Sequence, residues 1–223
     1  MKTTGVKLFP LIPSNHSRKN LIFFIFSLSF FLFVSGCSVK NASGDADEAY
    51  IKRLYDWTRS IKVFQDFSTR LYLSATYKTM DFRASYVERY SAAYQADEEA
   101  RLKLLEKEEE EALKFDDFFV VVYTPEKQWN DLDKKDSIWR LFLEDASGVK
   151  SGPAFITRLS RASPLEREFY PHLDEWSVAY EVRFLKQPRA EDGDEPRAIG
   201  PVRLKVTGVL GKGELVWDMQ GAR

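Results

Sequence analysis

Few side chains in this sequence could carry nucleophilic or acid–base chemistry. Its 223 residues include one cysteine and two histidines, and 33 Lys and Arg nearly balance 34 Asp and Glu. A lone cysteine excludes an intramolecular disulfide framework and any zinc site with several thiolates. Its thiol is nevertheless the strongest nucleophile available for alkylation. A covalent modification of this residue, Cys37, is therefore the first chemistry to consider.

The segment that precedes Cys37 has the pattern of an export signal. Arg18 and Lys19 come before residues 21–34, which are apolar except for two serines. Fourteen helical residues span only about 21 Å, which is shorter than the roughly 30 Å hydrocarbon core of a bilayer. The pattern therefore favours a signal-peptide core over a permanent membrane span.

Val34, Ser35, Gly36 and Cys37 resemble the lipobox of bacterial lipoprotein signal peptides: an aliphatic residue, two small residues and a cysteine. The resemblance covers residues 18–37. It implies that a signal peptidase recognises Val34, Ser35 and Gly36, that residues 1–36 are removed, and that Cys37 receives a diacylglyceryl group. Two or three acyl chains would anchor the protein to a membrane, because each buried methylene contributes about 0.8 kcal/mol.

The residue after Cys37 bears on the destination of the protein. It is Ser38 rather than aspartate. In lipoproteins of two-membrane bacteria this implies the periplasmic face of the outer membrane, and the alternative is the outer face of the cytoplasmic membrane.

Charge divides the chain into two parts of opposite sign. Residues 1–36 contain four basic residues and no acid, and the remaining 187 residues contain 29 basic and 34 acidic groups, a net charge of -5. A nucleic-acid-binding protein would need a concentrated basic face to displace counterions from phosphates. We therefore expect no nucleic-acid partner.

The residues after the leader divide into a tether and a folded region. Residues 37–47 predict a lipidated N-terminus and a flexible tether, because those after the cysteine are small and polar with no hydrophobic period. Ten extended residues reach at most about 35 Å, so the folded region would work close to the bilayer. We expect residues 48–223 to form a single folded domain, in which Asp47 caps a first short helix.

Alternation of apolar and polar residues predicts a series of strands after residue 68. A turn at residues 211–213 predicts a hairpin into the last strand. One helical insertion, at about residues 80–115, interrupts the series; we expect it to contain two helices, the first capped by Asp81 and the second by Asp97. Strands joined without helices pair antiparallel. We expect a mainly β, α+β fold: an antiparallel immunoglobulin-like β-sandwich, with a closed β-barrel as the alternative. The expected strands are residues 69–77, 118–123, 137–144, 155–159, 176–185 and 202–207.

Outside the leader, His172 is the only histidine, and Asp174 and Glu175 follow it closely. A histidine with carboxylates could act as a base or bind a metal, but no second histidine or free cysteine completes such a site. No phosphate-binding loop or nucleophile elbow has the required spacing. We expect His172 to be a loop residue with a local hydrogen bond, and the protein to have no catalytic residue, metal site or cofactor.

Residues 106–111 form an acidic run in the second expected helix. Lys103, Lys107 and Lys114 lie three or four residues from several of these acids and can pair with them along the helix. We expect this run to be a solvated helix face.

Aromatic residues are the best candidates for contacts with a partner. Tyr86, Tyr90 and Tyr94 recur at helical spacing and form a stripe that could face either the sheet or another molecule. Trp129 lies in a polar loop and is a candidate contact residue. Three other tryptophans have apolar neighbours at a spacing of two, and we expect them in the core: Trp139, Trp176 and Trp217.

These observations predict a membrane-anchored envelope lipoprotein that acts as a non-catalytic binding or assembly module. Its expected partners are the membrane, through the lipid on Cys37, and an envelope protein. The alternative is a carrier or sensor of an apolar ligand, held in a sandwich or barrel cavity lined by residues such as Val178, Tyr180 and Leu204. A hydrolase would instead need a cleft that brings His172 together with carboxylates or a serine.

Overall fold

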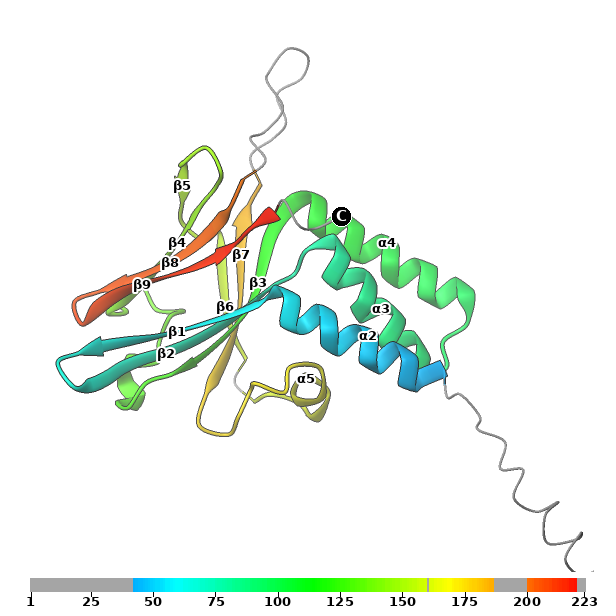
Figure 1. Cartoon of the computed structure of the whole chain (residues 1–223), viewed down its shortest axis with the longest axis horizontal. Helices are drawn as coiled ribbons and strands as arrows, with labels where there is room; N and C mark the ends of the chain where they lie inside the picture. Colours follow the sequence, from blue (N-terminus) through cyan, green and yellow to red (C-terminus); the bar gives the residue numbers. More distant parts are fainter. Residues whose placement is uncertain (1–41, 160, 187–199, 220–223) are drawn as a thin grey trace, which may run out of the picture. The chain divides into compact units, whose positions relative to one another are not determined.

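The structure is a computed structural model that describes residues 42–159, 161–186 and 200–219 (Figure 1). These residues form a mixed α+β fold made mostly of strands, and every strand pairing in it is antiparallel. The expectation of a mainly β, antiparallel α+β fold with a helical insertion is confirmed. None of the described helices is long and apolar enough to cross a membrane.

The larger sheet has five strands, in the order β1-β2-β3-β7-β6. Its central strand, β3, is covered on both faces, because the five residues 118–122 are each no more than 3% exposed. This agrees with its continuous apolar sequence. The strands are β1 (Thr58–Gln65), β2 (Ser68–Tyr77), β3 (Phe115–Tyr123), β6 (Phe155–Leu159) and β7 (Val178–Leu185).

The smaller sheet has four strands, in the order β5-β4-β8-β9. The hairpin between its last two strands turns at residues 209–210, two residues before the expected turn, and Gly211 begins the last strand with a φ of +141°. Only glycine adopts such a backbone readily. The strands are β4 (Trp139–Glu144), β5 (Lys150–Ser151), β8 (Val202–Gly208) and β9 (Gly211–Trp217).

The helices gather on one side of the larger sheet (Figure 1). The helical insertion consists of α3 (Met80–Tyr94) and α4 (Glu98–Lys114); Thr79 caps the first, in place of the expected Asp81, and Asp97 caps the second as expected. The first described helix, α2 (Ala42–Trp57), begins five residues before Asp47 and packs along α3. A short helix, α5 (Pro164–Phe169), begins with a capping box between Ser163 and Glu166.

The two sheets share an aromatic core. The ring of Phe118 stacks on Tyr77 at 4.6 Å and lies 5.3 Å from Trp217, so the larger sheet contacts the smaller through these rings. The edge strands β1 and β9 also meet, because a Cβ on Gly213 would lie 2.5 Å from Ile61. A hydrogen bond also links the two sides of this junction: Nε1 of Trp217 donates to the carbonyl of Trp57 at 2.8 Å.

The barrel alternative was wrong for the described strands. A barrel requires every strand to pair on both sides, whereas β1, β6, β5 and β9 each end a sheet. Although β1 and β9 lie close together, no ladder of backbone hydrogen bonds joins them among the described pairings.

Trp139 and Trp217 are buried as expected, but the prediction for Trp176 was wrong, because it is 71% exposed. Trp176 precedes β7 in a turn, where the carboxylate of Asp174 accepts hydrogen bonds from the amides of Trp176 and Ser177. The burial alternation therefore starts two residues later than the sequence suggested.

Candidate binding site

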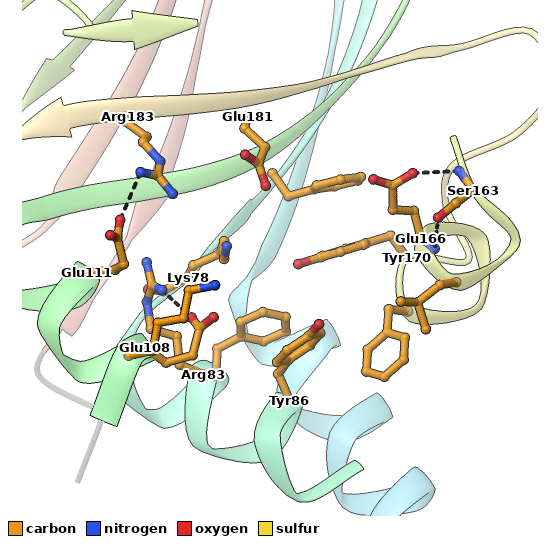
Figure 2. A pocket seen from close by; sticks show the side chains of 15 residues that line it. Lys78, Arg83, Tyr86, Glu108, Glu111, Ser163, Glu166, Tyr170, Glu181 and Arg183 are labelled. Carbon is orange, nitrogen blue, oxygen red and sulfur yellow. Dashed lines mark hydrogen bonds and ion pairs between the residues drawn. The ribbon is translucent and has the colours of Figure 1, made fainter. Parts of the chain in front are cut away.

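A cavity of about 390 Å³ lies between the helices and the larger sheet (Figure 2). Helices α3 and α4 form one wall, and α5 forms the opposite rim. The floor consists of β7, the middle of β3 and the residue that follows β2. Aromatic rings and charged groups alternate around it. The charged side chains that line it are Lys78, Arg83, Lys107, Glu108, Glu111, Glu166, Glu181 and Arg183.

Lys78 is the cation at the end of β2. Its backbone is fixed, since its amide donates to the carbonyl of Asp117 at 2.8 Å and its carbonyl accepts from Nε of Arg83 at 2.9 Å. No hydrogen bond or ion pair joins its ammonium group to another described residue. Burial lowers the pKa of Lys78, and the neighbouring guanidinium of Arg83 lowers it further.

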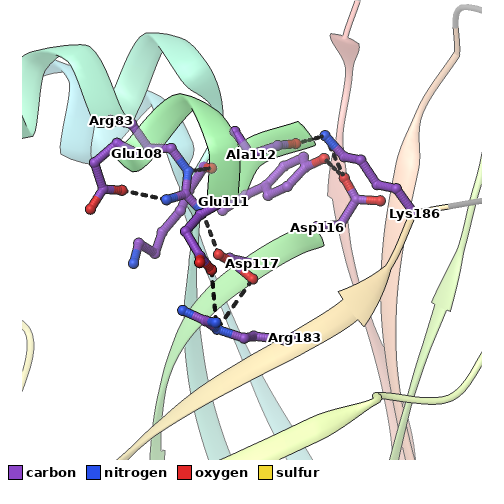
Figure 3. A network of polar contacts seen from close by, with 10 residues as sticks. Arg83, Glu108, Glu111, Ala112, Asp116, Asp117, Arg183 and Lys186 are labelled. Atoms are coloured by element: carbon purple, nitrogen blue, oxygen red, sulfur yellow. Dashed lines mark hydrogen bonds and ion pairs between the residues drawn. The ribbon is translucent and has the colours of Figure 1, made fainter. Parts of the chain in front are cut away.

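Arg83 lies deeper and is fully paired (Figure 3). Its side chain is 1% exposed, and its two terminal nitrogens donate to the carboxylates of Glu108 and Asp117. A buried guanidinium requires such partners, because an unpaired charge in the interior is very costly. This triad joins α3 and α4 to the central strand of the larger sheet.

Arg183 continues the network on β7. Its NH1 group lies 2.8 Å from the carboxylate of Glu111, and its Nε lies 3.6 Å from Asp117 (Figure 3). Beyond it, Lys186 donates to the carbonyl of Ala112 at 2.5 Å and lies 3.6 Å from Asp116. Both arginines of the cavity are thus used to hold α4 on the sheet.

Glu181 is the carboxylate of the floor. It lies on β7 opposite Phe119 of β3, on the side of the sheet that faces the helices, and points into the cavity (Figure 2). No hydrogen bond or ion pair joins its carboxylate to any other described residue. Lys78 and Glu181 attract each other electrostatically, but neither charge makes a hydrogen bond or a close ion pair with another described residue.

Two tyrosine hydroxyls add neutral polar groups to the cavity. Burial raises the pKa of Tyr86 to about 12 and the pKa of Tyr170 well above its usual value, so both hydroxyls stay protonated at neutral pH. Tyr170 is held in place by stacking on Phe119, with ring centres 3.7 Å apart. The site thus offers a cation, an anion and two hydroxyls that can donate or accept.

The predicted tyrosine stripe runs from this cavity to the surface. Tyr86 lines the cavity, and its ring lies 6.0 Å from Tyr90, which in turn lies 4.6 Å from Tyr94. Tyr86 and Tyr90 are partly buried, whereas Tyr94 is 57% exposed. One end of the stripe therefore belongs to the cavity, and the other is exposed at the surface.

Trp129 lies elsewhere, in the short 3-10 helix η1 (Lys127–Trp129). It is partly buried and lines an open groove together with Tyr72, Tyr123 and the exposed Trp176. Arg70 lies over its ring at 5.9 Å. The structure does not bring Trp129 together with the tyrosine stripe in one site.

His172 does not line the charged cavity. It packs edge-on against Phe119 and Tyr170, and burial lowers its pKa to about 4. Its Nε2 has no hydrogen-bond partner among the described residues, so the expected local hydrogen bond does not form at that atom.

The residues expected for an apolar-ligand cavity do not line one site. Tyr180 and Leu204 belong to the packed core, and neither lines the charged cavity or the groove beside Trp129. Val178 lines a separate, smaller cavity near Arg158. The groups expected for lipid attachment, Val34, Ser35, Gly36 and Cys37, lie outside the described residues.

The acidic run was only partly the solvated face we expected. Lys103 pairs with Glu99 and Lys114 with Glu110 on the outside of α4. Glu108 and Glu111 instead face the sheet and bind the two arginines. Their helical spacing with Leu104 and Ala112 was a usable signal, because residues i, i+4, i+7 and i+8 share one face.

Lys78 and Glu181 were also missed as site residues. Lys78 follows directly after a strand, and Glu181 is one of two charged residues in an otherwise largely apolar strand. Neither feature is specific without the sheet order, which places their strands on either side of β3. Within the described residues, no group of three His, Cys, Asp or Glu side chains could hold a metal ion.

No protein-family model, no curated protein and no solved structure matches this chain. Function has to be inferred from the site itself.

Proposed function

We propose that this protein is a lipid-anchored lipoprotein of the bacterial envelope that binds a small polar ligand without chemical change. The observation that carries the proposal is the uneven pairing of charges in the cavity. Arg83 and Arg183 are bound by carboxylates, whereas Lys78 and Glu181 attract each other but make no hydrogen bond or close ion pair among the described residues. Partly buried charges without close partners are costly, and a ligand that pairs with them would offset this cost.

The lipobox supports the anchoring part of the proposal. A lipid on Cys37 would hold the folded region near the membrane, on the periplasmic face of the outer membrane, or alternatively on the outer face of the cytoplasmic membrane. No signal peptidase site other than Val34, Ser35 and Gly36 has this pattern in the sequence.

The exposed end of the tyrosine stripe supports an additional contact with an envelope protein. Tyr94 is 57% exposed, and aromatic side chains at the surface are enriched in protein interfaces. In this proposal the module binds its ligand at one end of the stripe and its protein partner at the other.

We propose further that the two sheets pack as an immunoglobulin-like β-sandwich, with α3 and α4 as an insertion. The common core of Phe118, Tyr77 and Trp217 supports the packing of the two sheets against each other. An experimental structure tests this proposal, since an immunoglobulin-like domain requires aligned sheets joined by Greek-key connections.

Two measurements on the full chain test the proposed function. Growth with an alkyne-labelled fatty acid should label the wild-type protein and leave Cys37→Ser unlabelled; an unlabelled wild type with its leader still attached would refute the anchor. Native mass spectrometry of protein purified gently in detergent should show a bound small molecule. Lys78→Gln should lose that molecule, whereas the matched surface variant Lys103→Gln should keep it. An empty wild-type protein would refute ligand binding.

A further inference from the structure

We infer that the ligand of this cavity is a small zwitterion of amino-acid or dipeptide size, with its carboxylate on Lys78 and its ammonium on Glu181. This inference rests on the proposed function and goes further by naming the chemistry of the ligand.

The pairing of the other charges singles out these two. The guanidiniums of Arg83 and Arg183 are each bound to carboxylates of α4 and share Asp117. Glu166 is held in its capping box, where its carboxylate accepts from the amide of Ser163. These groups build the walls and are not free to recognise a ligand.

Lys107 is the remaining cation that lines the cavity, and it is more exposed to solvent than Lys78. It is exposed on α4, where water solvates its ammonium group. The ammonium of Lys78 is desolvated by the surrounding protein, which is why its pKa falls. An anionic group therefore gains more from pairing with Lys78 than with Lys107.

Charge complementarity then selects a ligand with both signs. A purely anionic ligand would pair with Lys78 but bring a second negative charge towards Glu181. A purely cationic ligand would pair with Glu181 and repel Lys78. A zwitterion satisfies both groups and adds no net charge to a cavity in which the other charges already balance closely.

The size and walls of the cavity agree with such a ligand. Small-molecule sites are typically about 300–1,000 Å³, so a cavity of about 390 Å³ is at the small end. Phe82, Phe119 and Phe169 supply apolar surface for a carbon skeleton, and the hydroxyls of Tyr86 and Tyr170 can bind the remaining polar atoms (Figure 2).

The position of the two charges also bears on the length of the ligand. Lys78 and Glu181 extend from strands on either side of β3, and adjacent strands lie about 4.8 Å apart. The two charged side chains therefore enter the cavity from opposite sides of β3, and a ligand that pairs with both must extend from one to the other. Probes with different separations between ammonium and carboxylate report the spacing directly.

Isothermal titration calorimetry of the full chain in detergent tests the inference. The zwitterionic probes are alanine, alanyl-alanine and 5-aminovalerate, and the single-charge probes are propionate and propylamine. At least one zwitterion should bind, and it should bind at least tenfold more tightly than either single-charge probe. Comparable binding of propionate or propylamine would overturn the inference.

Two charge-neutral variants assign the roles of the residues. Lys78→Gln should weaken the best zwitterion at least tenfold and remove the discrimination against propylamine. Glu181→Gln should weaken it similarly and remove the discrimination against propionate. Lys103→Gln and Glu109→Gln, on the exposed side of α4, are the matched controls and should leave the affinity unchanged. Unchanged zwitterion binding in both cavity variants would also overturn the inference.

Failure of this inference is distinguishable from failure of the proposed function. If native mass spectrometry shows a ligand that depends on Lys78, but no zwitterion binds, the ligand class is wrong and the binding function stands. If neither experiment shows a ligand, both are wrong. Near-ultraviolet circular dichroism should confirm that each variant retains the packing of its aromatic side chains.

Discussion

The two faces of the larger sheet differ sharply, although the same strands build both. On β3, Phe118 faces the smaller sheet and packs against Tyr77 and Trp217, whereas its neighbours Asp117 and Phe119 face the helices. On β7, Val182 is fully buried in the core, but Glu181 and Arg183 line the charged cavity. One face is mainly apolar, with Asp116 at its edge bonded to Tyr77, and the other holds the charged groups of the cavity.

Alternate side chains of one strand point to opposite faces of the sheet. A single strand therefore contributes to the stabilising core on one face and to the proposed binding site on the other. Apolar burial supplies stability without needing partners of defined geometry. Buried ion pairs contribute little net stability, because desolvation offsets their attraction. The charges on the helix-facing side therefore need a reason other than stability, and ligand binding is the one we propose.

The largest effect should come from the apolar face. Trp217→Ala removes a side chain that is 0% exposed and bonded to the carbonyl of Trp57. We expect the free energy of unfolding to fall by about 3–5 kcal/mol. Urea denaturation measures it, with Trp176→Ala as the exposed control. A similar loss in both variants would contradict the assignment of Trp217 to the core.

Breaking the buried triad on the polar face should cost about 3–4 kcal/mol. Arg83→Gln leaves the carboxylates of Glu108 and Asp117 without their cation in the interior. Urea denaturation should show a much smaller loss for Arg101→Gln, whose ion pairs lie at the surface.

An apolar triple variant of the same triad tests whether the fold needs the charges themselves. Replacing Arg83, Glu108 and Asp117 together by Met, Leu and Leu should recover most of the stability that Arg83→Gln loses, because apolar groups can replace buried ions. A triple variant as unstable as Arg83→Gln would show that the charges are needed for the fold itself.

A pH dependence should arise at His172, which packs against Phe119 and Tyr170 on the helix-facing side of the larger sheet. Burial lowers its pKa from 6.5 to about 4 in the folded chain. Between these values the unfolded chain binds the proton and the folded chain does not, so the free energy of unfolding falls as pH drops from 6.5 towards 4. His172→Gln should reduce this fall by about 1–3 kcal/mol. Thermal unfolding at both pH values checks it, and Glu175→Gln should retain the wild-type slope.

Lys78 should lower the stability of the folded chain, although we propose that it is needed for ligand binding. Because burial lowers its pKa, the unfolded chain holds this proton to a higher pH than the folded chain does. Stability therefore rises through the alkaline range between the two pKa values. Lys78→Met should raise the free energy of unfolding at pH 7, flatten that alkaline rise and abolish zwitterion binding. Denaturation at pH 7 and pH 10 measures this, and a less stable variant would contradict it.

The smallest effect on stability should occur at the outer end of the tyrosine stripe. Tyr94 is 57% exposed, so Tyr94→Ala should change the free energy of unfolding by no more than about 0.5 kcal/mol. Tyr50, which is 0% exposed and bonded to the carbonyl of Phe169, provides the contrast. Thermal denaturation of both alanine variants checks the prediction, and a loss at Tyr94 equal to that at Tyr50 would contradict it.

Most of the strands could be predicted because local alternation determines them. The pattern in residues 69–77 and 202–207 matches β2 and β8 closely, and Asp97 marks the start of α4. β1 was missed; a register shift between its buried Val63 and exposed Phe64 interrupts the pairing with β2. Trp176 was misplaced because a turn held by Asp174 interrupts the pattern next to it.

The site could not be predicted in the same way, because its groups come together only through sheet order. Lys78, Glu108 and Glu181 come from a strand end, a helix and a strand far apart in the sequence. A carboxylate in an acidic run looks the same whether it faces water or an arginine. What could be predicted was the stripe that leads to the site, since Tyr86 and Tyr90 follow helical spacing.

The hydrogen bond between Trp217 and Trp57 also constrains the order in which the protein can fold. It joins residues 160 positions apart, and contacts of such long sequence separation form slowly because a large loop must close first. During synthesis the end of α2 and the edge of β1 must wait for β9, the last strand, to leave the ribosome. The junction between the two sheets is therefore among the last parts of the described fold to form, because it needs strands from both ends of that fold.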